Sequence, residues 1–313
     1  MGEINTKKSF KPSKNVLFLV MVLPALIWFV LIAYLPMFGL VLAFKRFHFY
    51  RGGFFESLLH SQWVGLENFY FLFTSHAAYI ITRNTLLYNL SFIILTTICS
   101  IAIAICLSEL LNKRLAKFYQ TFMFLPYFLS TIVVGYVLLS FLSVDKGSIN
   151  HALMFFGMQP INWYSHPGYW PAILIIITLW KNIGYTSIFY LAAILAIGRH
   201  FYEAAELDGA SKWQQIWNIT IPHIKPIIII LVLIAIGNIF KADFGTFYWY
   251  PMNSGALFPA TNVIDTYVFR GLMDSGNVGM TTAAGLYQSV MGLILIVSLN
   301  KLVKKYDSEN AMF

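Results

Sequence analysis

Residues 203–222 read EAAELDGASKWQQIWNITIP, and the interpretation of the whole chain depends on this polar stretch. Charged and titratable side chains gather at its start, from Arg199 to Lys212. Long apolar segments flank it, at residues 170–197 and 221–240. A polar stretch between two segments of membrane-spanning length must face water. Its pattern of apolar and polar positions predicts a helix that lies against a partner.

The composition is that of a membrane protein that crosses the bilayer several times. Of the 313 residues, 58% are hydrophobic and 11% are charged, whereas a soluble domain carries about 25% charged residues. Apolar segments of spanning length are predicted at residues 16–43, 79–111, 118–142, 169–197, 224–243 and 280–303. The sequence therefore predicts an all-α polytopic membrane protein with six transmembrane helices.

Two spans contain prolines, and an aromatic stretch between the first two spans predicts a short surface helix. Pro24 and Pro36 lie inside the first span, so we expect a bent or broken helix there. Pro126 lies inside the third span. Residues 63–73, WVGLENFYFLF, are typical of a short amphipathic helix at the outer membrane surface.

The distribution of basic residues predicts that both ends of the chain are cytoplasmic. Most of the 21 Lys and Arg residues fall in segments that six spans place inside, and cytoplasmic segments are enriched in these residues. We therefore expect a basic N-terminus over residues 1–15, one transmembrane domain over residues 16–305 and a tail over residues 306–313. The same bias explains the formal charge of +8 without a nucleic-acid partner.

Two residues predict the local shape of the polar stretch. A glycine inside a helix costs about 1 kcal/mol relative to alanine, so Gly209 indicates either a turn between two short helices or a close approach of another backbone. Pro222 then begins the next span, as proline does at helix N-termini. An apolar side is predicted from Ala204, Ala205, Leu207, Ala210 and Trp213.

The same stretch resembles the cytoplasmic motif of binding-protein-dependent ABC importer permeases, E-A-A-x3-G-x9-I-x-L-P. The positions that match are Glu203, Ala204, Ala205, Gly209, Ile219 and Pro222, and Ile221 stands where the family has Leu. The resemblance implies the type I importer permease fold, with a cytoplasmic coupling helix at about residues 200–218 that sits in a cleft of an ATPase subunit. The implied ATPase-coupling residues are Glu203, Ala204, Ala205, Leu207, Asp208, Gly209 and Ala210.

The resemblance also implies partners, because the chain has no ATPase motif of its own. No G-x-x-x-x-G-K-[ST] run occurs in the sequence, so no enzyme activity and no bound cofactor are predicted for this chain. ATP and Mg are then used by two separate ATPase subunits. A second, homologous permease and an extracellular sugar-binding protein, lipid-anchored or periplasmic, complete the implied complex in the lipids of a bacterial plasma (inner) membrane.

Further stretches resemble the carbohydrate permeases, in particular those for oligosaccharides or aldouronates. They lie at residues 35–47, 63–69, 83–86, 124–130, 190–194 and 263–270. This resemblance implies import of a sugar, most simply an oligosaccharide. A permease for another solute, such as a peptide or amino acid, is the alternative. A membrane-embedded enzyme is a remoter one, since it would need ionisable residues clustered at one depth.

Residues of the substrate pathway are predicted on physical grounds alone. A charge inside a span costs at least about 2.5 kcal/mol at the bilayer centre, so Lys181 should face a partner, a ligand or water. The rings of Trp180 and Tyr185 could stack on sugars or pack against other helices. The predicted pathway set is Trp180, Lys181, Tyr185, Asn238, Lys241, Asp243 and Tyr287. No metal site is predicted, because the seven histidines do not cluster at ligand spacing.

Overall fold

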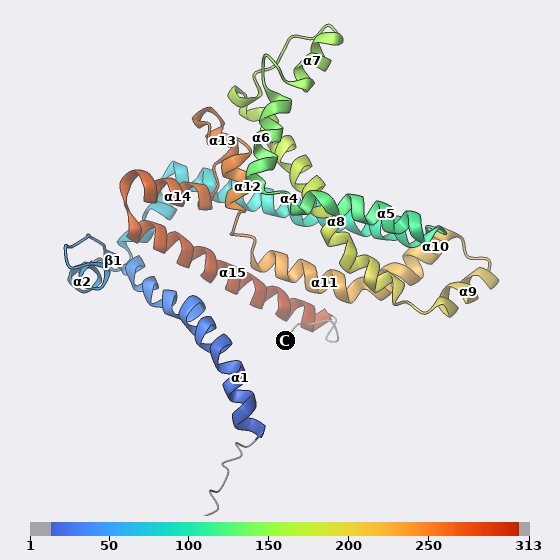
Figure 1. Cartoon of the computed structure of the whole chain (residues 1–313), viewed down its shortest axis with the longest axis horizontal. Coiled ribbons are helices and arrows are strands. Elements are labelled where there is room, and N and C mark those ends of the chain that lie inside the picture. The colour runs from blue at the N-terminus through green and yellow to red at the C-terminus, as the bar shows by residue number, and fades with distance from the viewer. Residues whose placement is uncertain (1–13, 307–313) are drawn as a thin grey trace, which may run out of the picture.

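Long helices that pack side by side form most of the molecule (Figure 1), and the computed structural model describes residues 14–306. Five helical segments are long and apolar enough to cross a membrane: Phe18–Phe44, His76–Ser108, Pro167–Leu195, Lys212–Gly237 and Val278–Lys305. A bent pair, Lys113–Phe128 and Thr131–Leu142, passes the same test together. The described part of the chain thus has six candidate spans if that pair counts as one, which agrees with the prediction.

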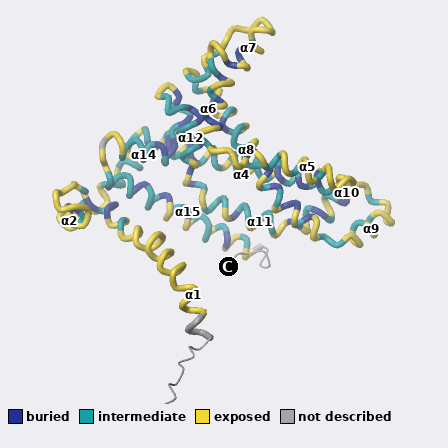
Figure 2. Tube along the Cα trace, in the orientation of Figure 1, coloured by how far each residue is buried: buried dark blue, intermediate teal, exposed yellow. Residues whose placement is uncertain are grey.

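The first span extends away from the other helices (Figures 1 and 2), and none of its most apolar window is buried. It begins as α1 (Lys14–Phe29), which continues through Pro24, and then changes to a π-helical turn (Val30–Tyr34) and a 3-10 helix (Leu35–Phe44). The predicted irregularity is therefore a change of helix type. Pro36 sits in the first turn of the 3-10 helix, where its missing N–H costs least.

The segment after this span, residues 45–75, is more irregular than predicted. Strand β1 (Lys45–Arg46) pairs antiparallel with β2 (Gln62–Trp63), and α2 (Phe54–His60) lies between them. A 3-10 turn (Glu67–Phe69) and α3 (Phe71–Thr74) follow. The prediction of one amphipathic helix over residues 63–73 is wrong, because the first of these residues pairs in a strand and the rest form two short turns.

Helix α4 (His76–Ser108) lies against α8 (Trp170–Leu195), and these two helices are the centre of the bundle. Between them in sequence, α5 (Lys113–Phe124) crosses α8 at Gly184. A Cβ atom at Gly184 would lie 1.9 Å from the carbonyl oxygen of Met123. The absence of a side chain at residue 184 therefore allows this crossing.

The third predicted span is not one helix. After α5, a 3-10 turn (Leu125–Phe128) contains Pro126, and Leu129 and Ser130 are extended before α6 (Thr131–Leu142) begins. The two halves meet at 95°. The predicted span over residues 118–142 is therefore a bent pair of helices: helical geometry continues through Pro126, at the start of the 3-10 turn, and is interrupted at Leu129 and Ser130.

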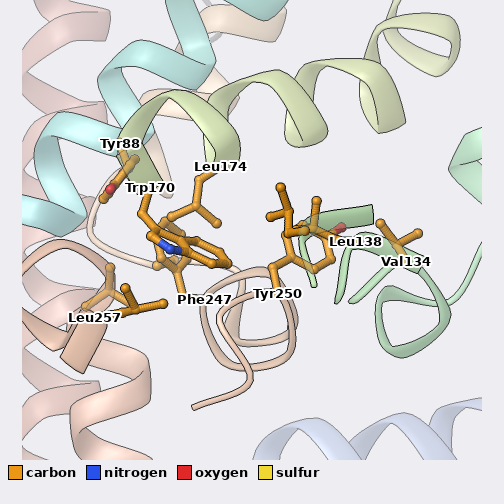
Figure 3. Close-up of a cluster of buried hydrophobic side chains, with 11 residues drawn as sticks. Tyr88, Val134, Leu138, Trp170, Leu174, Phe247, Tyr250 and Leu257 are labelled. Atoms are coloured by element: carbon orange, nitrogen blue, oxygen red, sulfur yellow. The ribbon is translucent and has the colours of Figure 1, made fainter. Parts of the chain in front are cut away.

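A cluster of buried side chains, here called the outer cluster, joins α4, α6 and α8 to shorter elements of the second half of the chain (Figure 3). Trp170, Tyr250 and Phe247 are its largest fully buried members, and all are at most 1% exposed. The shorter elements are α12 (Phe244–Trp249) and the turns Trp163–Ser165 and Gly255–Leu257. A further turn, Pro167–Tyr169, leads into α8. Helix α7 (Ser148–Phe155) projects beyond the cluster (Figure 1).

The fifth span ends earlier than predicted. Helix α11 (Ile221–Gly237) stops at Gly237 instead of residue 243, and α12 begins only at Phe244. Helices α13 (Phe258–Thr261), α14 (Ile264–Ser275) and α15 (Val278–Tyr306) complete the fold. The predicted segments 1–15 and 306–313 fall largely outside the described residues.

Candidate coupling segment and transport cavity

Residues 199–220, here called the coupling segment, form a helix, a turn and a second helix, as the sequence predicts. Helix α9 (Arg199–Leu207) is followed by α10 (Lys212–Gln215) and a π-helical turn (Ile216–Thr220) that runs directly into α11. The segment lies at the far end of the bundle (Figure 1). Its second half and α11 together form one helical span, Lys212–Gly237.

Gly209 makes the turn because its backbone adopts a left-handed conformation, with φ of +76°. The amide of Ala210 donates to the carbonyl of Ala205 at 2.9 Å, and the amide of Gly209 donates to the carbonyl of Glu206 at 3.1 Å. This is the Schellman arrangement that ends helices at a glycine. A Cβ atom at residue 209 would meet no described atom of this chain within 4 Å. Of the two predicted reasons for the glycine, the structure therefore shows the turn.

The second helix starts with a reciprocal cap. The side chain of Ser211 accepts from the amide of Gln214, and the Gln214 side chain accepts from the amide of Ser211 at 2.7 Å. This capping box satisfies two backbone donors that a helix start leaves free. Gln215 is buried, and its Nε2 donates to the carbonyl of Ala210 at 3.3 Å. The turn is thus held from both sides.

Ion pairs fix the charged side of the coupling segment. Lys212 lies 3.0 Å from Glu206 and 3.8 Å from Glu109, the residue at the end of α4. The hydrogen bond from Lys212 lowers the pKa of Glu206 below its ordinary value. Arg199 pairs with Glu203 at 3.2 Å. The predicted residue Glu203 is therefore part of an ion pair on the surface of α9.

Large apolar side chains of the coupling segment remain uncovered. Leu207 is 90% exposed and Trp213 is 72% exposed. Trp217, in the following turn, is also exposed. Ala205 and Ala210 are half-buried, whereas Ala204, Asp208 and Gly209 are exposed. Apolar side chains of this size in such a charged segment mark a surface that another molecule covers.

A cavity of about 510 Å³ lies between α4, the turn at Leu125–Phe128, α8 and α11. The rings of Tyr127 and Tyr185 stack in it, with centroids 4.2 Å apart and planes at 7°. Asn182 and Thr186 line the same cavity. The hydroxyl of Thr178, another lining residue, is buried without a hydrogen-bond partner in the described part of the chain. The cavity thus combines flat aromatic surface with amide and hydroxyl groups.

Trp180 and Lys181, the predicted pathway residues nearest to Tyr185 in sequence, do not line the Tyr185 cavity. Trp180 lines a different, apolar cavity of about 540 Å³ with Met123 and Pro126. The Nζ atom of Lys181 donates to Oγ1 of Thr131 at 3.0 Å. Among the described residues, no carboxylate lies within ion-pair distance of Lys181.

The remaining predicted pathway residues lie outside the lining of the Tyr185 cavity. Asn238 is exposed and donates to the carbonyl of Ile234 in its own helix. Asp243 caps α12 and accepts from the amide of Thr246 at 3.0 Å. Lys241 is exposed. Tyr287 packs edge-on against Phe240, with centroids 5.8 Å apart.

Sequence reasoning missed several polar residues of the interior. Thr178 and Asn182 are spaced so that they share one face of α8 with the predicted residue Tyr185, a signal that the sequence contains. Tyr127 had no such signal, because only the bend after α5 brings it to α8. The half-buried residue Asp265 was likewise not singled out. No group of three or more His, Cys, Asp or Glu able to hold a metal ion occurs among residues 14–306.

Comparison with known proteins gives a family match over residues 97–307, to the binding-protein-dependent transport system inner membrane component. The chain is 35% identical over 295 residues to the polygalacturonan/rhamnogalacturonan transport system permease protein YteP of Bacillus subtilis (strain 168), covering 92% of this chain and 88% of that protein. It is 26% identical to the arabinooligosaccharides transport system permease protein AraP of Halalkalibacterium halodurans, covering 96% of this chain and 92% of AraP.

A solved structure is similar over almost the whole chain. It is the crystal structure of a bacterial ABC transporter involved in the import of the acidic polysaccharide alginate. The match has a TM-score of 0.84 and 30% identity, and covers 94% of this chain and 96% of the matched chain. A second structure contains the alginate ABC transporter in complex with a periplasmic protein that holds an alginate pentasaccharide, and its TM-score is 0.83. The family match and these likenesses confirm the resemblance and the predicted fold. The chain belongs to the family of inner membrane components of binding-protein-dependent transport systems, as a permease of the ABC importer type.

Proposed function

We propose that this chain is the permease subunit of an ATP-driven importer that moves an oligosaccharide across a bacterial inner membrane. The observation that carries the proposal is the coupling segment, which combines the family motif with exposed Leu207 and Trp213. Support for the sugar comes from YteP and AraP, whose names give polysaccharide or oligosaccharide transport. The alginate importer structure supports it further.

The coupling segment is the contact for a separate ATPase subunit. Leu207 and Trp213 are the apolar contacts, because burying one such side chain contributes roughly 1.5–3 kcal/mol. The turn at Gly209 sets the angle between the contact helix α9 and the helix that continues into α11. Two ATPase subunits bind ATP and Mg, and their closure displaces this segment. In this arrangement the segment and both chain ends are cytoplasmic.

The cavity at Tyr185 is the part of the substrate pathway that this chain supplies. Aromatic rings stack on the apolar faces of sugar rings, and the stacked pair of Tyr127 and Tyr185 presents such a surface. Asn182 and Thr186 supply hydrogen bonds for sugar hydroxyls. Few polar groups placed in a largely apolar cavity are typical of small-molecule sites. Lys181 lies one helical turn before Tyr185 on α8.

A second, homologous permease closes the pathway from the other side, and an extracellular sugar-binding protein delivers the substrate. The exposed α1 part of the first span supports a subunit or lipid contact, because none of the span's most apolar window is buried. The structure of the alginate importer with its periplasmic protein supports the delivery step.

The test of this function is reconstitution of the complete importer in lipid vesicles. The complex is isolated through a tag on this chain, its binding protein is screened against oligosaccharides, peptides and amino acids, and uptake of the retained ligand is measured with ATP on the side of the ATPase subunits. ATP-dependent uptake of an oligosaccharide is the expected result. Uptake of a peptide or amino acid instead would show a non-sugar importer, and turnover of a substrate without any ATPase would show an enzyme.

A further inference from the structure

The chain is not helical between α11 and α12, at residues 238–243, here called the joint. Backbone polar groups that leave a helix need other partners when they are shielded from water. In the joint, the carbonyls of Ile239, Phe240 and Lys241 and the amide of Ala242 all bond to side chains of other helices. The joint is therefore held by long-range contacts as well as by local turns, such as the one in which the amide of Lys241 donates to the carbonyl of Asn238 at 2.8 Å.

Three side chains make these contacts. Nδ2 of Asn89, on α4, donates to the carbonyls of Ile239 at 2.7 Å and Lys241 at 3.1 Å. Nε2 of Gln288, on α15, donates to the carbonyl of Phe240 at 2.7 Å. Asp265, on α14, accepts from the amide of Ala242 at 2.8 Å.

These contacts also connect to one another. Gln288 is only 7% exposed, and its Nε2 donates to Oδ2 of Asp265 at 3.0 Å as well as to the joint. Asp265 and Gln288 thus form one hydrogen-bonded pair that bridges α14 and α15. Since Asn89 contacts the joint from α4, side chains of three helices form hydrogen bonds with the backbone of the joint.

The joint lies at the opposite end of a rod from the coupling segment. The helical span Lys212–Gly237 contains α10 of the coupling segment and all of α11. At 1.5 Å per residue it is about 39 Å long. A displacement of the coupling segment reaches the joint through this rod. A flexible joint would absorb the displacement, whereas a joint hydrogen-bonded to α4, α14 and α15 transmits it to these helices.

We propose that Asn89, Asp265 and Gln288 are positioning residues that make the joint a rigid link between the coupling segment and the outer elements. The inference rests on the proposed function, because it needs an importer driven through residues 199–220. These residues act through backbone geometry, and they set how much substrate moves for each ATP that is hydrolysed.

The test uses the complete reconstituted importer and measures molecules of substrate imported per ATP hydrolysed. Gln288→Leu keeps the size of the side chain and removes its donors. Asn89→Asp keeps the shape and replaces two donors by acceptors. Ser289→Ala is the matched control, because Ser289 is exposed on the same helix and its hydroxyl donates to the carbonyl of Gly285 in that helix. The expected result is at least a tenfold fall in the ratio for Gln288→Leu and Asn89→Asp, with ATP hydrolysis retained, and an unchanged ratio for Ser289→Ala.

A purely structural role gives a different result. Fewer assembled complexes would lower transport and ATP hydrolysis together and leave their ratio unchanged, and this outcome overturns the proposal. If Gln288→Leu and Asn89→Asp both fail to assemble while Ser289→Ala does assemble, Asp265→Asn serves as a further variant. An unchanged ratio of substrate to ATP in Asp265→Asn would then also overturn the proposal. Failure of all three to assemble would make these contacts structural and would overturn it too. Failure of the proposed function is distinguishable, because the unmodified complex itself would then show no ATP-dependent uptake.

Discussion

The outer cluster and the coupling segment both contain large aromatic side chains, and they use them in opposite ways. In the outer cluster, Trp170 is completely buried and its Nε1 donates to the carbonyl of Trp163 at 2.8 Å. In the coupling segment, Trp213 is 72% exposed and Leu207 is 90% exposed. The first region completes its packing within one chain. The second has a well-defined backbone, fixed by a glycine turn and a capping box, but leaves its apolar side chains for a partner.

This difference teaches where stability and function lie. Removing a side chain from the outer cluster opens a cavity in the fold. Removing one from the coupling segment leaves the packing of the fold intact and, under the proposed function, removes a contact with an ATPase subunit. The two regions should therefore respond separately to substitution, the first in stability and the second in coupling to ATP hydrolysis.

The largest expected effect is on stability, from a matched pair of tryptophan substitutions. Trp170→Ala should destabilise the protein by about 3–5 kcal/mol, as truncation of a buried tryptophan does, and should sharply reduce the amount of folded protein in the membrane. Trp213→Ala should leave that amount unchanged and weaken only association with the ATPase subunit. Thermal unfolding of the purified chain in detergent, together with co-purification of the ATPase, measures both. Similar losses of stability in the two variants would contradict the comparison.

The next effect separates backbone shape from stability inside the coupling segment. A β-branched residue is strongly disfavoured at the φ of +76° that Gly209 adopts, whereas asparagine tolerates left-handed backbone. Gly209→Val should therefore reduce transport at least tenfold while the protein remains assembled, and Gly209→Asn should keep most transport. Uptake into vesicles, normalised to assembled complex, provides the measurement. Equal transport by the valine and asparagine variants would show that the left-handed turn is not what the coupling requires.

The extent to which local structure could be predicted from the sequence alone differs between these regions. The coupling segment was predictable, because Gly209, Ser211 and Pro222 set a helix, a turn and a second helix through local backbone chemistry. The 95° bend after α5 was not predicted, although Pro126 marked it, because a proline alone does not tell whether a span bends or breaks. The early end of α11 was hidden for a different reason. Backbone polar groups after the end of α11 form hydrogen bonds with Asn89, Asp265 and Gln288, which are distant in sequence.

The candidate cavity shows the same division. Tyr185 was predicted from its residue type, but Tyr127 reaches it only through the bend at Leu125–Phe128. Trp180 and Tyr185 are close in sequence and yet line different cavities, because five residues on a helix correspond to well over one full turn.

A smaller effect concerns the charge beside the cavity. Lys181 has no ion-pair partner among the described residues, and it lies one helical turn before Tyr185 on α8. Lys181→Met should reduce uptake of acidic oligosaccharides several-fold more than uptake of neutral ones, whereas Lys117→Met, at an exposed position on α5, should change neither. Competition uptake assays with the two sugar classes provide the readout. Equal effects on both classes would assign Lys181 a structural role through Thr131.

The smallest effect is the pH dependence of the ion pair on the coupling segment. Because the hydrogen bond from Lys212 lowers the pKa of Glu206, the pair stabilises the segment above the ordinary carboxyl range, and this contribution is lost as pH falls through the lowered pKa. Both side chains are exposed, so the contribution is small. The wild type should unfold at a slightly higher temperature than Glu206→Gln at neutral pH, and the gap should close in acid. A gap that widens in acid would contradict this sign.

The central claim is that an ATPase subunit covers residues 199–220 on the cytoplasmic side, and site-specific cross-linking tests it most directly. A single cysteine at the position of Leu207 is introduced after Cys99 and Cys106, which are free thiols, have been replaced by alanine. The account predicts that this cysteine forms a cross-link to the ATPase subunit in the assembled complex. Treating intact cells first with a membrane-impermeant thiol reagent should not reduce the cross-link, because the reagent cannot reach a cytoplasmic cysteine. Labelling of this cysteine from outside the cell, or no cross-link in a complex that hydrolyses ATP, would contradict it.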